Sequence, residues 1–181
     1  MKKNILHLLI VIVSTFTFLE ANSQNFPKLD VSPMDATSYP SNWRQSDKIV
    51  KIYYSRPQLK GRALEKLAPE GKVWRTGANE APEITFYTDV MFGDKEVKAG
   101  TYSLFTIPNK ENWTIILSNQ KNIWGAYFYD KSKDEIRVTS KLSNSETTIE
   151  AFSIAFEGEG DKATMHMGWG KTISSIDIVK K

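Results

Sequence analysis

Short stretches in which apolar and polar residues alternate fill most of the chain after residue 48. In the first of them, Val50, Ile52 and Tyr54 alternate with Lys51 and Tyr53. Alternation with a period of two is typical of a β-strand that has one face buried and the other in water. Patterns of this kind predict further strands at 84–87, 102–107, 113–117, 123–129, 136–142, 149–156, 163–169 and 172–179. The chain is therefore expected to consist of about nine or ten short strands joined by turns.

The spacing of these strands indicates the fold class. Only one helical turn is expected between them, at 63–67, where Pro69 ends it. Parallel strands need long crossover connections, usually helices, so a parallel α/β sheet is not expected. We predict an all-β domain over residues 49–181, an antiparallel β-sandwich or jelly-roll-like fold with one short helical turn. Residues 24–48, which are rich in Pro, Ser, Asp and Asn, are expected to form an irregular segment laid over it.

Residues 1–23 have the layout of a secretory signal peptide. Two lysines precede an apolar run from Ile5 to Leu19, and small residues at Ala21 and Ser23 fit a cleavage site. The run is too short and wrongly flanked for a stable membrane span, although a retained N-terminal anchor is the alternative. We therefore expect an exported protein, periplasmic or secreted, that is soluble and has no membrane span after cleavage.

Composition excludes several kinds of chemistry. Lys and Arg number 24 against 21 Asp and Glu, a net charge of +3, which gives no argument for nucleic acid as a partner. The chain has no cysteine, so disulfides, thiol nucleophiles and zinc–thiolate sites are excluded. Five Trp, seven Tyr and nine Phe residues supply large side chains for a core without covalent cross-links. No cofactor is expected.

Arginines gather in the stretch from residue 54 to residue 81. It holds Arg56, Arg62 and Arg75, three of the chain's five arginines, although lysine is far commoner elsewhere. Arginine is favoured over lysine where a planar fork must hold a carboxylate, a phosphate or a carbonyl in fixed geometry. We predict that these guanidinium groups converge at one end of the fold, either on a ligand or on the protein's own turns.

Several strings of residues are specific enough to suggest a family. They are Tyr54-Ser-Arg-Pro57, Gly61-Arg62, Val73-Trp-Arg-Thr-Gly-Ala-Asn-Glu-Ala81, Ala99-Gly-Thr-Tyr-Ser-Leu-Phe-Thr-Ile-Pro108, Trp113-Thr-Ile-Ile-Leu117 and Trp124-Gly125. Together they resemble the DUF2911 family, which comprises exported proteins, mostly from Bacteroidetes. The resemblance extends from about Leu29 to Val179. It implies an exported all-β domain from a bacterium with an outer membrane, and it brings no established activity.

Candidate catalytic groups are few. Strand alternation predicts a half-exposed side chain for His166, and a catalytic triad or a metal site is the alternative. No other histidine follows residue 23 and no HExxH, GxSxG or P-loop string occurs, so no metal site is predicted. Glu80 is the first candidate for an acid/base carboxylate. The alternative is that Glu80 forms an internal ion pair with Arg56, Arg62 or Arg75 that fixes the loop.

Aromatic and small polar residues complete the candidate site. Trp74, Trp124 and Tyr127 either form a platform on which a sugar stacks or belong to the core. Thr76 and Asn79 lie in a glycine-containing turn, where they would present a hydroxyl and an amide to a polar ligand. A self-satisfied turn is the structural alternative.

Two functions of different classes follow from these observations. The first is a binding module for a polar or anionic ligand, a glycan or a partner protein. The second is a carbohydrate-active hydrolase or lyase with Glu80 as acid/base. The lack of a paired catalytic set favours the first. Its predicted ligand-binding residues are Arg56, Arg62, Trp74, Arg75, Thr76, Asn79, Trp124 and Tyr127.

Overall fold

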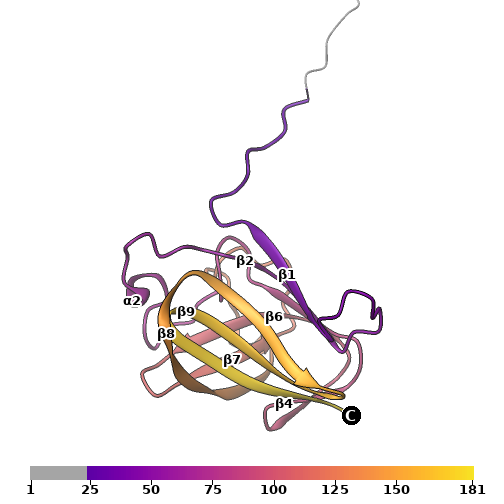
Figure 1. The fold of residues 1–181 in the computed structure, drawn as a ribbon. Helices are drawn as coiled ribbons and strands as arrows, with labels where there is room; N and C mark the ends of the chain where they lie inside the picture. The colour runs from indigo at the N-terminus through magenta and orange to yellow at the C-terminus, as the bar shows by residue number, and fades with distance from the viewer. Residues whose placement is uncertain (1–23) are drawn as a thin grey trace, which may run out of the picture.

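A computed structural model describes residues 24–181, which form nine β-strands, one short α-helix and one 3₁₀ helix (Figure 1). The helix α2 covers Leu64–Leu67, and the 3₁₀ helix covers Lys131–Lys133. No helix within these residues has the length and apolarity needed to cross a bilayer. The signal peptide predicted for residues 1–23 lies outside the described residues. The strands are β1 (Met34–Tyr39), β2 (Val50–Ser55), β3 (Glu83–Phe86), β4 (Val90–Phe92), β5 (Lys95–Val97), β6 (Gly100–Pro108), β7 (Asn112–Ser118), β8 (Asp134–Glu159) and β9 (Lys162–Lys180).

The nine strands pair antiparallel in one sheet, in the order β1-β2-β3-β6-β7-β8-β9-β4-β5. The predicted all-β antiparallel class is therefore confirmed. Residues 24–181 form a single continuous sheet, and two separate stacked sheets are not seen among them. Alternation identifies strands, whereas their division into one sheet or two depends on pairings between distant residues that alternation does not encode.

The two longest strands, β8 and β9, each unite two strands that the sequence predicts separately. The pairing of β8 with β9 shifts register between Asn144 and Ile149 and again between Ile149 and Ser153. Such irregularities bend a strand without ending it, and both ribbons curve together in Figure 1. The breaks in alternation before Ile149 and at Gly170 therefore mark bends within strands.

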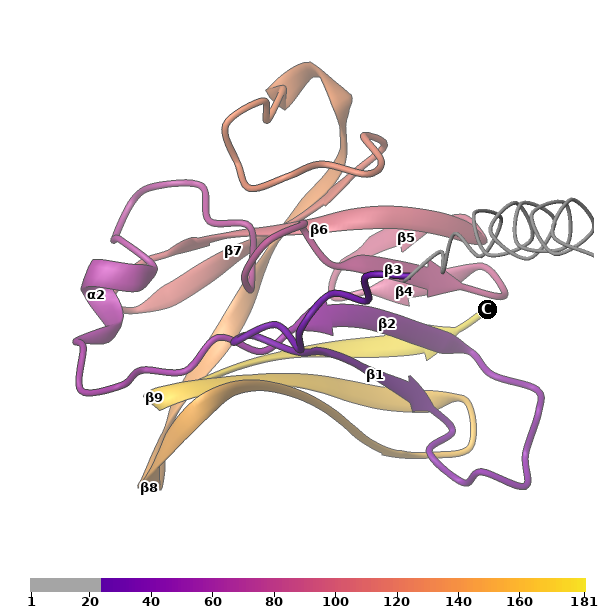
Figure 2. The same cartoon turned by 90° about the horizontal axis from the view of Figure 1, so that it is seen from above.

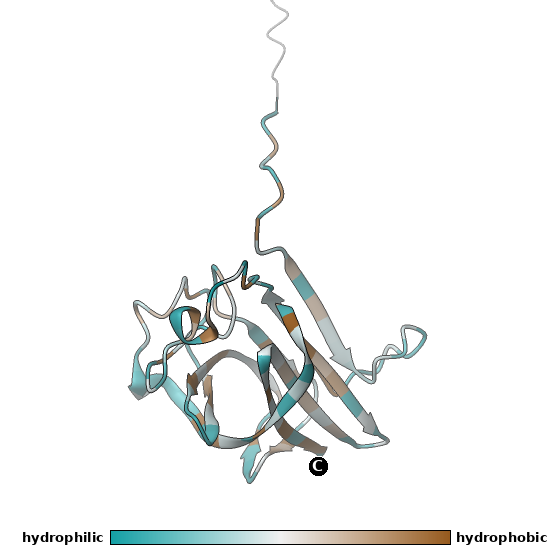
Figure 3. Cartoon of the chain, turned by 60° about the vertical axis from the view of Figure 1, so that its left-hand side comes forward, coloured by the Kyte–Doolittle hydropathy of each residue, from teal (hydrophilic) through white to brown (hydrophobic). Residues whose placement is uncertain are grey.

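The core is centred on four aromatic side chains. Trp74 stacks on Trp169 with ring centroids 5.4 Å apart, and it meets Trp113 and Phe152 edge to face at 6.0 and 5.3 Å. Figure 3 shows the bands of polar and apolar residues along the strands that a sheet with one buried face requires. Trp74 is 4% exposed. It therefore belongs to the core, and the alternative role as an open stacking platform does not fit this position.

Two segments differ from the secondary structure expected for them. Met34–Tyr39 forms the edge strand β1, inside the segment 24–48 that was expected to be irregular. Most of β1 is exposed or half-buried, so its sequence shows little alternation. Conversely, residues 123–129 form no strand beyond an isolated bridge at Trp124. They belong to a loop, and this loop forms part of the candidate site described below.

Candidate functional site

Two segments far apart in the sequence, the 75–80 turn and the 119–130 loop, lie side by side. The amide of Gly125 donates a hydrogen bond to the carbonyl of Asn79, with an N···O distance of 2.8 Å. The 119–130 loop follows β7, and Figure 2 shows the connection from β7 to β8 standing out from the sheet. The pairing therefore gives the projecting loop a fixed attachment to the turn.

Glu80 lies opposite Trp124 in this pairing, in an isolated antiparallel bridge. The adjacent amide of Ala81 donates to the carbonyl of Ile123, with an N···O distance of 2.8 Å. Residues on both sides of the bridge were proposed for the site from the sequence. The structure thus brings together Asn79, Glu80, Trp124 and the loop that carries Tyr127.

Three large aromatic side chains of the 119–130 loop are open to solvent. Trp124, Tyr127 and Phe128 are 59%, 80% and 76% exposed, and we call them the aromatic ledge. Within residues 24–181, no ring of the ledge stacks on another aromatic ring. Gly125 has a φ of +68°, and a Cβ there would lie 2.7 Å from Cε2 of Tyr127. Glycine therefore lets the tyrosine ring lie against the backbone. Trp124 and Tyr127 were predicted from the sequence as site residues, whereas Phe128 was not.

A second, smaller apolar cluster supports the loop. Tyr129 packs edge to face on Phe105, with ring centroids 5.0 Å apart. The Tyr129 hydroxyl lies 2.7 Å from both carboxylate oxygens of Asp134, and Arg137 Nε donates to the same carboxylate at 2.7 Å. The end of the loop is therefore anchored while its aromatic tip is exposed. The cluster consists of Ala81, Phe105 and Ile116, with Val73, Ile107, Ile123, Ala126 and Tyr129 packed against them.

The ionisation of the Tyr129 hydroxyl should make the free energy of unfolding depend on pH. Burial, and then the hydrogen bond to Asp134, raise the pKa of Tyr129 from 10.0 to about 12. The neutral phenol is thus favoured in the folded state, and this stabilisation is present below pH 10 and lost as the pH rises towards 12. We expect Tyr129→Phe to lower the free energy of unfolding by about 1–2 kcal/mol at about pH 8, because the hydrogen bonds are lost. Urea titrations should show that the difference in free energy of unfolding between the wild type and Tyr129→Phe becomes smaller between about pH 10 and pH 12. A difference that stays constant over this range would contradict the predicted role of the neutral phenol.

The backbone of the two segments contains three non-glycine residues with positive φ angles. Thr76, Asn79 and Asn122 have φ values of +54°, +59° and +55°. Asparagine tolerates this region, but a β-branched residue rarely adopts it, and strain of this kind costs about 1–3 kcal/mol. Thr76 is fully buried, and its hydroxyl lies 3.2 Å from the hydroxyl of Thr106. Thr76 therefore fixes the shape of the turn from inside and is closed to a ligand.

Arg56 is bound to the protein itself. Its Nε donates to the carbonyl of Phe152 at 3.1 Å, one terminal nitrogen donates to Asp35 at 2.9 Å, and the other donates to the Ser153 hydroxyl at 2.7 Å. These bonds fasten the end of β2 to β8 and to the edge strand β1. The whole guanidinium fork is used, so Arg56 has a structural role.

The guanidinium of Arg62 is also bound by acceptors of the protein itself. Its guanidinium donates to the carbonyl oxygens of Leu59 at 2.9 Å and Gln58 at 2.7 Å, which closes the turn before α2. The predicted convergence of three arginines is therefore not formed. Within the described part of the chain, Arg56, Arg62 and Arg75 share no acceptor.

Arg75 differs from the other two. Its Nε is buried and has no hydrogen-bond acceptor among the residues that the structure describes. Trp74 points into the main core and pairs with Thr106 in an isolated bridge, so its neighbour Arg75 faces the opposite side of that pair. That is also the side of Val73, which packs against the second apolar cluster, as do Ile123 and Ala126 of the loop. Arg75 is thus a half-buried cation with unused donors beside the 119–130 loop.

Replacement of the two arginines by lysine should separate their roles. We expect Arg56→Lys to lower the free energy of unfolding by about 1–2 kcal/mol, because an ammonium group cannot hold three acceptors in the geometry of the fork. Arg75→Lys should change it by less than about 0.5 kcal/mol, because no such bonds are lost. Thermal and urea unfolding measure both, and a larger loss for Arg75→Lys than for Arg56→Lys would contradict the assignment.

The Glu80 side chain is exposed and forms no ion pair among residues 24–181. The internal pairing of Glu80 with Arg56, Arg62 or Arg75, one of the two sequence-based interpretations, is therefore not formed. The neighbouring carboxylate of Glu83 is used differently, since it accepts a hydrogen bond from the amide of Asn122 at 3.2 Å. Glu80 thus presents a free acceptor next to Trp124.

His166 is half-exposed on β9. Its Nδ1 lies 2.8 Å from the hydroxyl of Ser175, and its Nε2 lies 3.7 Å from a carboxylate oxygen of Glu157. Within residues 24–181, no group of three or more His, Asp or Glu side chains is arranged to hold a metal ion. His166 is therefore a strand histidine with local polar contacts.

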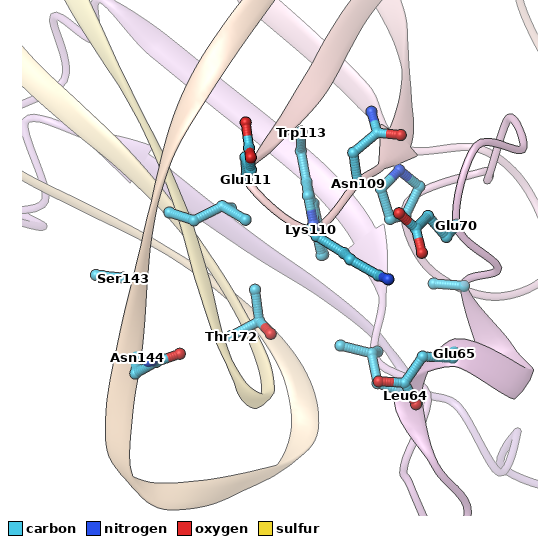
Figure 4. Close-up of a pocket in the computed structure, with 13 residues that line it drawn as sticks. Leu64, Glu65, Glu70, Asn109, Lys110, Glu111, Trp113, Ser143, Asn144 and Thr172 are labelled. Carbon is cyan, nitrogen blue, oxygen red and sulfur yellow. The ribbon is translucent and has the colours of Figure 1, made fainter.

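A cleft of about 400 Å³ opens beside α2, between the β6–β7 turn and the bends of β8 and β9 (Figure 4). Its lining includes the carboxylates of Glu65, Glu70 and Glu111, with Lys110 and the indole of Trp113. Carboxylates outnumber the cation, so the cleft does not suit the anionic ligand expected from the sequence. The residues that line the cleft come from segments far apart in the chain, and no sequence motif connects them, so the cleft was not predicted from the sequence.

Comparison with known proteins gives one match. A family model described as a protein of unknown function (DUF2911) matches residues 32–178, from just before β1 to near the end of β9. No curated protein and no solved structure matched the chain. The matched range includes the 75–80 turn, the 119–130 loop and the sheet except for the last two residues of β9.

Proposed function

This chain belongs to the DUF2911 family, and we propose that it is a binding protein that holds a glycan against the aromatic ledge. The faces of sugar rings would stack on Trp124, Tyr127 and Phe128, while Asn79 and Glu80 exchange hydrogen bonds with sugar hydroxyls. One observation carries the proposal: three aromatic side chains are exposed on a projecting loop whose base is anchored by buried contacts.

Exposed aromatic rings in a group call for a physical explanation. Each ring left in water forgoes about 1.5–3 kcal/mol of burial free energy, and three such rings within five residues of one loop favour an interaction surface over chance exposure. The neighbouring groups are polar, namely the amide of Asn79 and the carboxylate of Glu80. Ring faces next to hydrogen-bonding groups suit a saccharide, which has apolar faces and a rim of hydroxyls, better than a wholly apolar partner.

The geometry supports binding more than the alternative, a carbohydrate-active hydrolase or lyase with Glu80 as acid/base. A carboxyl that donates a proton near neutral pH is kept protonated by desolvated, apolar surroundings. The Glu80 side chain is exposed instead, and it lies outside the cleft beside α2. Glycoside hydrolysis also requires a second carboxylate across the scissile bond. We therefore place binding ahead of catalysis.

We also propose that the protein acts outside the cytoplasm, in the periplasm or as a secreted protein. The support is the N-terminal sequence, in which two lysines precede an apolar run that ends in small residues at Ala21 and Ser23. N-terminal sequencing of the protein from its native host should find Gln24 as the first residue. A protein that retains Met1 would contradict export by cleavage.

Glycan-array screening tests the binding function. The purified protein should be compared with the double variant Trp124→Ala/Tyr127→Ala and with Trp43→Ala. Trp43 is 80% exposed and lies outside the ledge, so its variant controls for loss of an exposed tryptophan. We expect the wild type and Trp43→Ala to bind the same glycans and the double variant to bind them at least about tenfold more weakly.

Two results would refute this function. One is that the wild type binds no glycan on the array. The other is that the double variant binds as tightly as Trp43→Ala. Capture of a protein partner through Trp124 and Tyr127, with no glycan bound, would assign the ledge to protein recognition instead.

A further inference from the structure

We propose that the ligand of the aromatic ledge is an acidic saccharide, whose carboxylate or sulfate group is held by the guanidinium of Arg75. This inference rests on the proposed glycan-binding function and specifies the class of glycan. It starts from the one arginine of the 54–81 stretch whose guanidinium is not satisfied by the protein.

The hydrogen-bonding state of Arg75 is the first argument. A buried donor without an acceptor costs about 1–3 kcal/mol, and a guanidinium that the protein leaves without acceptors calls for a specific explanation, such as an ion or ligand bound at its accessible end. Arg56 and Arg62 show that this fold can satisfy a guanidinium with its own carbonyl groups. The buried Nε itself is closed to an outside group, but the two terminal nitrogens also form no hydrogen bond among residues 24–181 and are not buried. They can meet an external acceptor, and the planar guanidinium fork matches a carboxylate or a sulfate.

The other charged groups near the ledge are the second argument. Lys121 donates to the carbonyl of Thr101 and lies over the ring of Tyr102, so its charge is already engaged. Glu83 accepts from the amide of Asn122. Asp130, at the end of the loop, accepts from the amide of Ser132 at 2.9 Å. Among the described residues of the two segments, this leaves Arg75 as the cation and Glu80 as the anion whose side chains have no hydrogen-bond partner.

This pair of free groups fits one kind of ligand. An acidic sugar presents an anion, for Arg75, and hydroxyl donors, for Glu80, around the same ring. The acid group must then lie on the Arg75 side, because it would be repelled by Glu80. A neutral sugar would offer the guanidinium only uncharged hydroxyl oxygens, which are weaker acceptors than a carboxylate or a sulfate. The two charges thus define an orientation for the ligand across the ledge.

The rigidity of the 75–80 turn is the third argument. Thr76 holds a positive φ through full burial and its contact with Thr106, and a Cβ at Gly77 would lie 2.9 Å from the carbonyl oxygen of Ser55. The backbone on the C-terminal side of Arg75 therefore has little freedom. A group held in place before binding loses less entropy when the ligand arrives, which favours a specific contact.

Isothermal titration calorimetry with two matched probes tests the inference. The probes are an oligogalacturonate and a neutral galactose oligosaccharide of the same length. We expect the acidic probe to bind at least about tenfold more tightly at low salt and to lose that advantage as salt is added. Arg75→Gln should bind both probes equally, and Arg75→Lys should retain part of the preference. Arg44→Gln removes an exposed arginine that stacks on Trp43, outside the ledge, and should behave as the wild type.

The outcomes separate this inference from the proposed function. Equal binding of both probes by the wild type would overturn the acidic class and leave glycan binding intact. An unchanged preference in Arg75→Gln would overturn the role of Arg75. Failure of every glycan to bind, here and on the array, would overturn both. Thermal unfolding of Arg75→Gln confirms that the variant is folded when its binding is measured.

Discussion

Replacing Trp74 with alanine is expected to lower the free energy of unfolding by about 3–5 kcal/mol. The side chain is 4% exposed, stacks on Trp169, and contacts Trp113 and Phe152 edge to face. These three partners come from β7, β8 and β9, so no single local shift refills the cavity that the substitution leaves. Since domains of this size are stable by only about 5–15 kcal/mol, the loss is a large share of the total. Urea titration followed by far-UV circular dichroism measures it.

Trp43→Ala is the control for this measurement. Trp43 is 80% exposed and has the guanidinium of Arg44 4.4 Å above its ring. Its replacement should change the free energy of unfolding by less than about 0.5 kcal/mol, as expected for a surface site. Similar losses in Trp74→Ala and Trp43→Ala would show that Trp74 does not occupy the centre of the core.

The position of Trp74 also shows why the sequence left its role open. Alternation located the strands β2, β3, β6 and β7 to within about two residues, because each has buried apolar residues at alternate positions, although β6 and β7 are buried on both faces in the middle. Trp74 does not lie in a strand of this kind. It pairs with Thr106 of β6 only in an isolated bridge, so no run of alternating neighbours indicates which way its ring points.

The loop at 123–129 was mistaken for a strand for a related reason. Its aromatic composition is what a half-buried strand requires, and a loop that displays aromatic rings has the same composition. The feature that distinguishes them is the left-handed conformation of Gly125, at φ +68°. Glycine occurs in bulges within strands as well as in turns, so its presence in the sequence does not decide between the two.

The arginines were recognised from the sequence, but their acceptors were not. The choice of arginine over lysine predicts that something is held by a planar fork, and this is true of Arg56 and Arg62. Arg56 binds Asp35 on β1, a strand that was expected to be irregular, and two residues of β8. Which arginine stays free depends on these long-range pairings, so Arg75 could be singled out only in three dimensions.

Gly77→Ala is expected to cost about 2–4 kcal/mol of stability and also to weaken ligand binding at the ledge. Gly77 has a φ of +156°, which L-residues rarely adopt, and a Cβ there would lie 2.9 Å from the carbonyl oxygen of Ser55. Ser55 is the last residue of β2, so relief of this contact must shift either the strand or the turn. A shift of the turn moves Arg75 and Asn79 relative to the ledge. Thermal unfolding and calorimetry with the acidic probe measure the two effects.

Gly71→Ala is the control that separates the strain of a positive φ angle from the close contact with Ser55 that occurs at Gly77. Gly71 has a φ of +70°, and no atom lies within 4 Å of a Cβ built there. Its replacement should therefore cost only the conformational strain, about 1–2 kcal/mol, and leave ligand affinity unchanged. If Gly77→Ala loses no more stability than Gly71→Ala and binds the probe as tightly as the wild type, then the contact with Ser55 does not position the 75–80 turn.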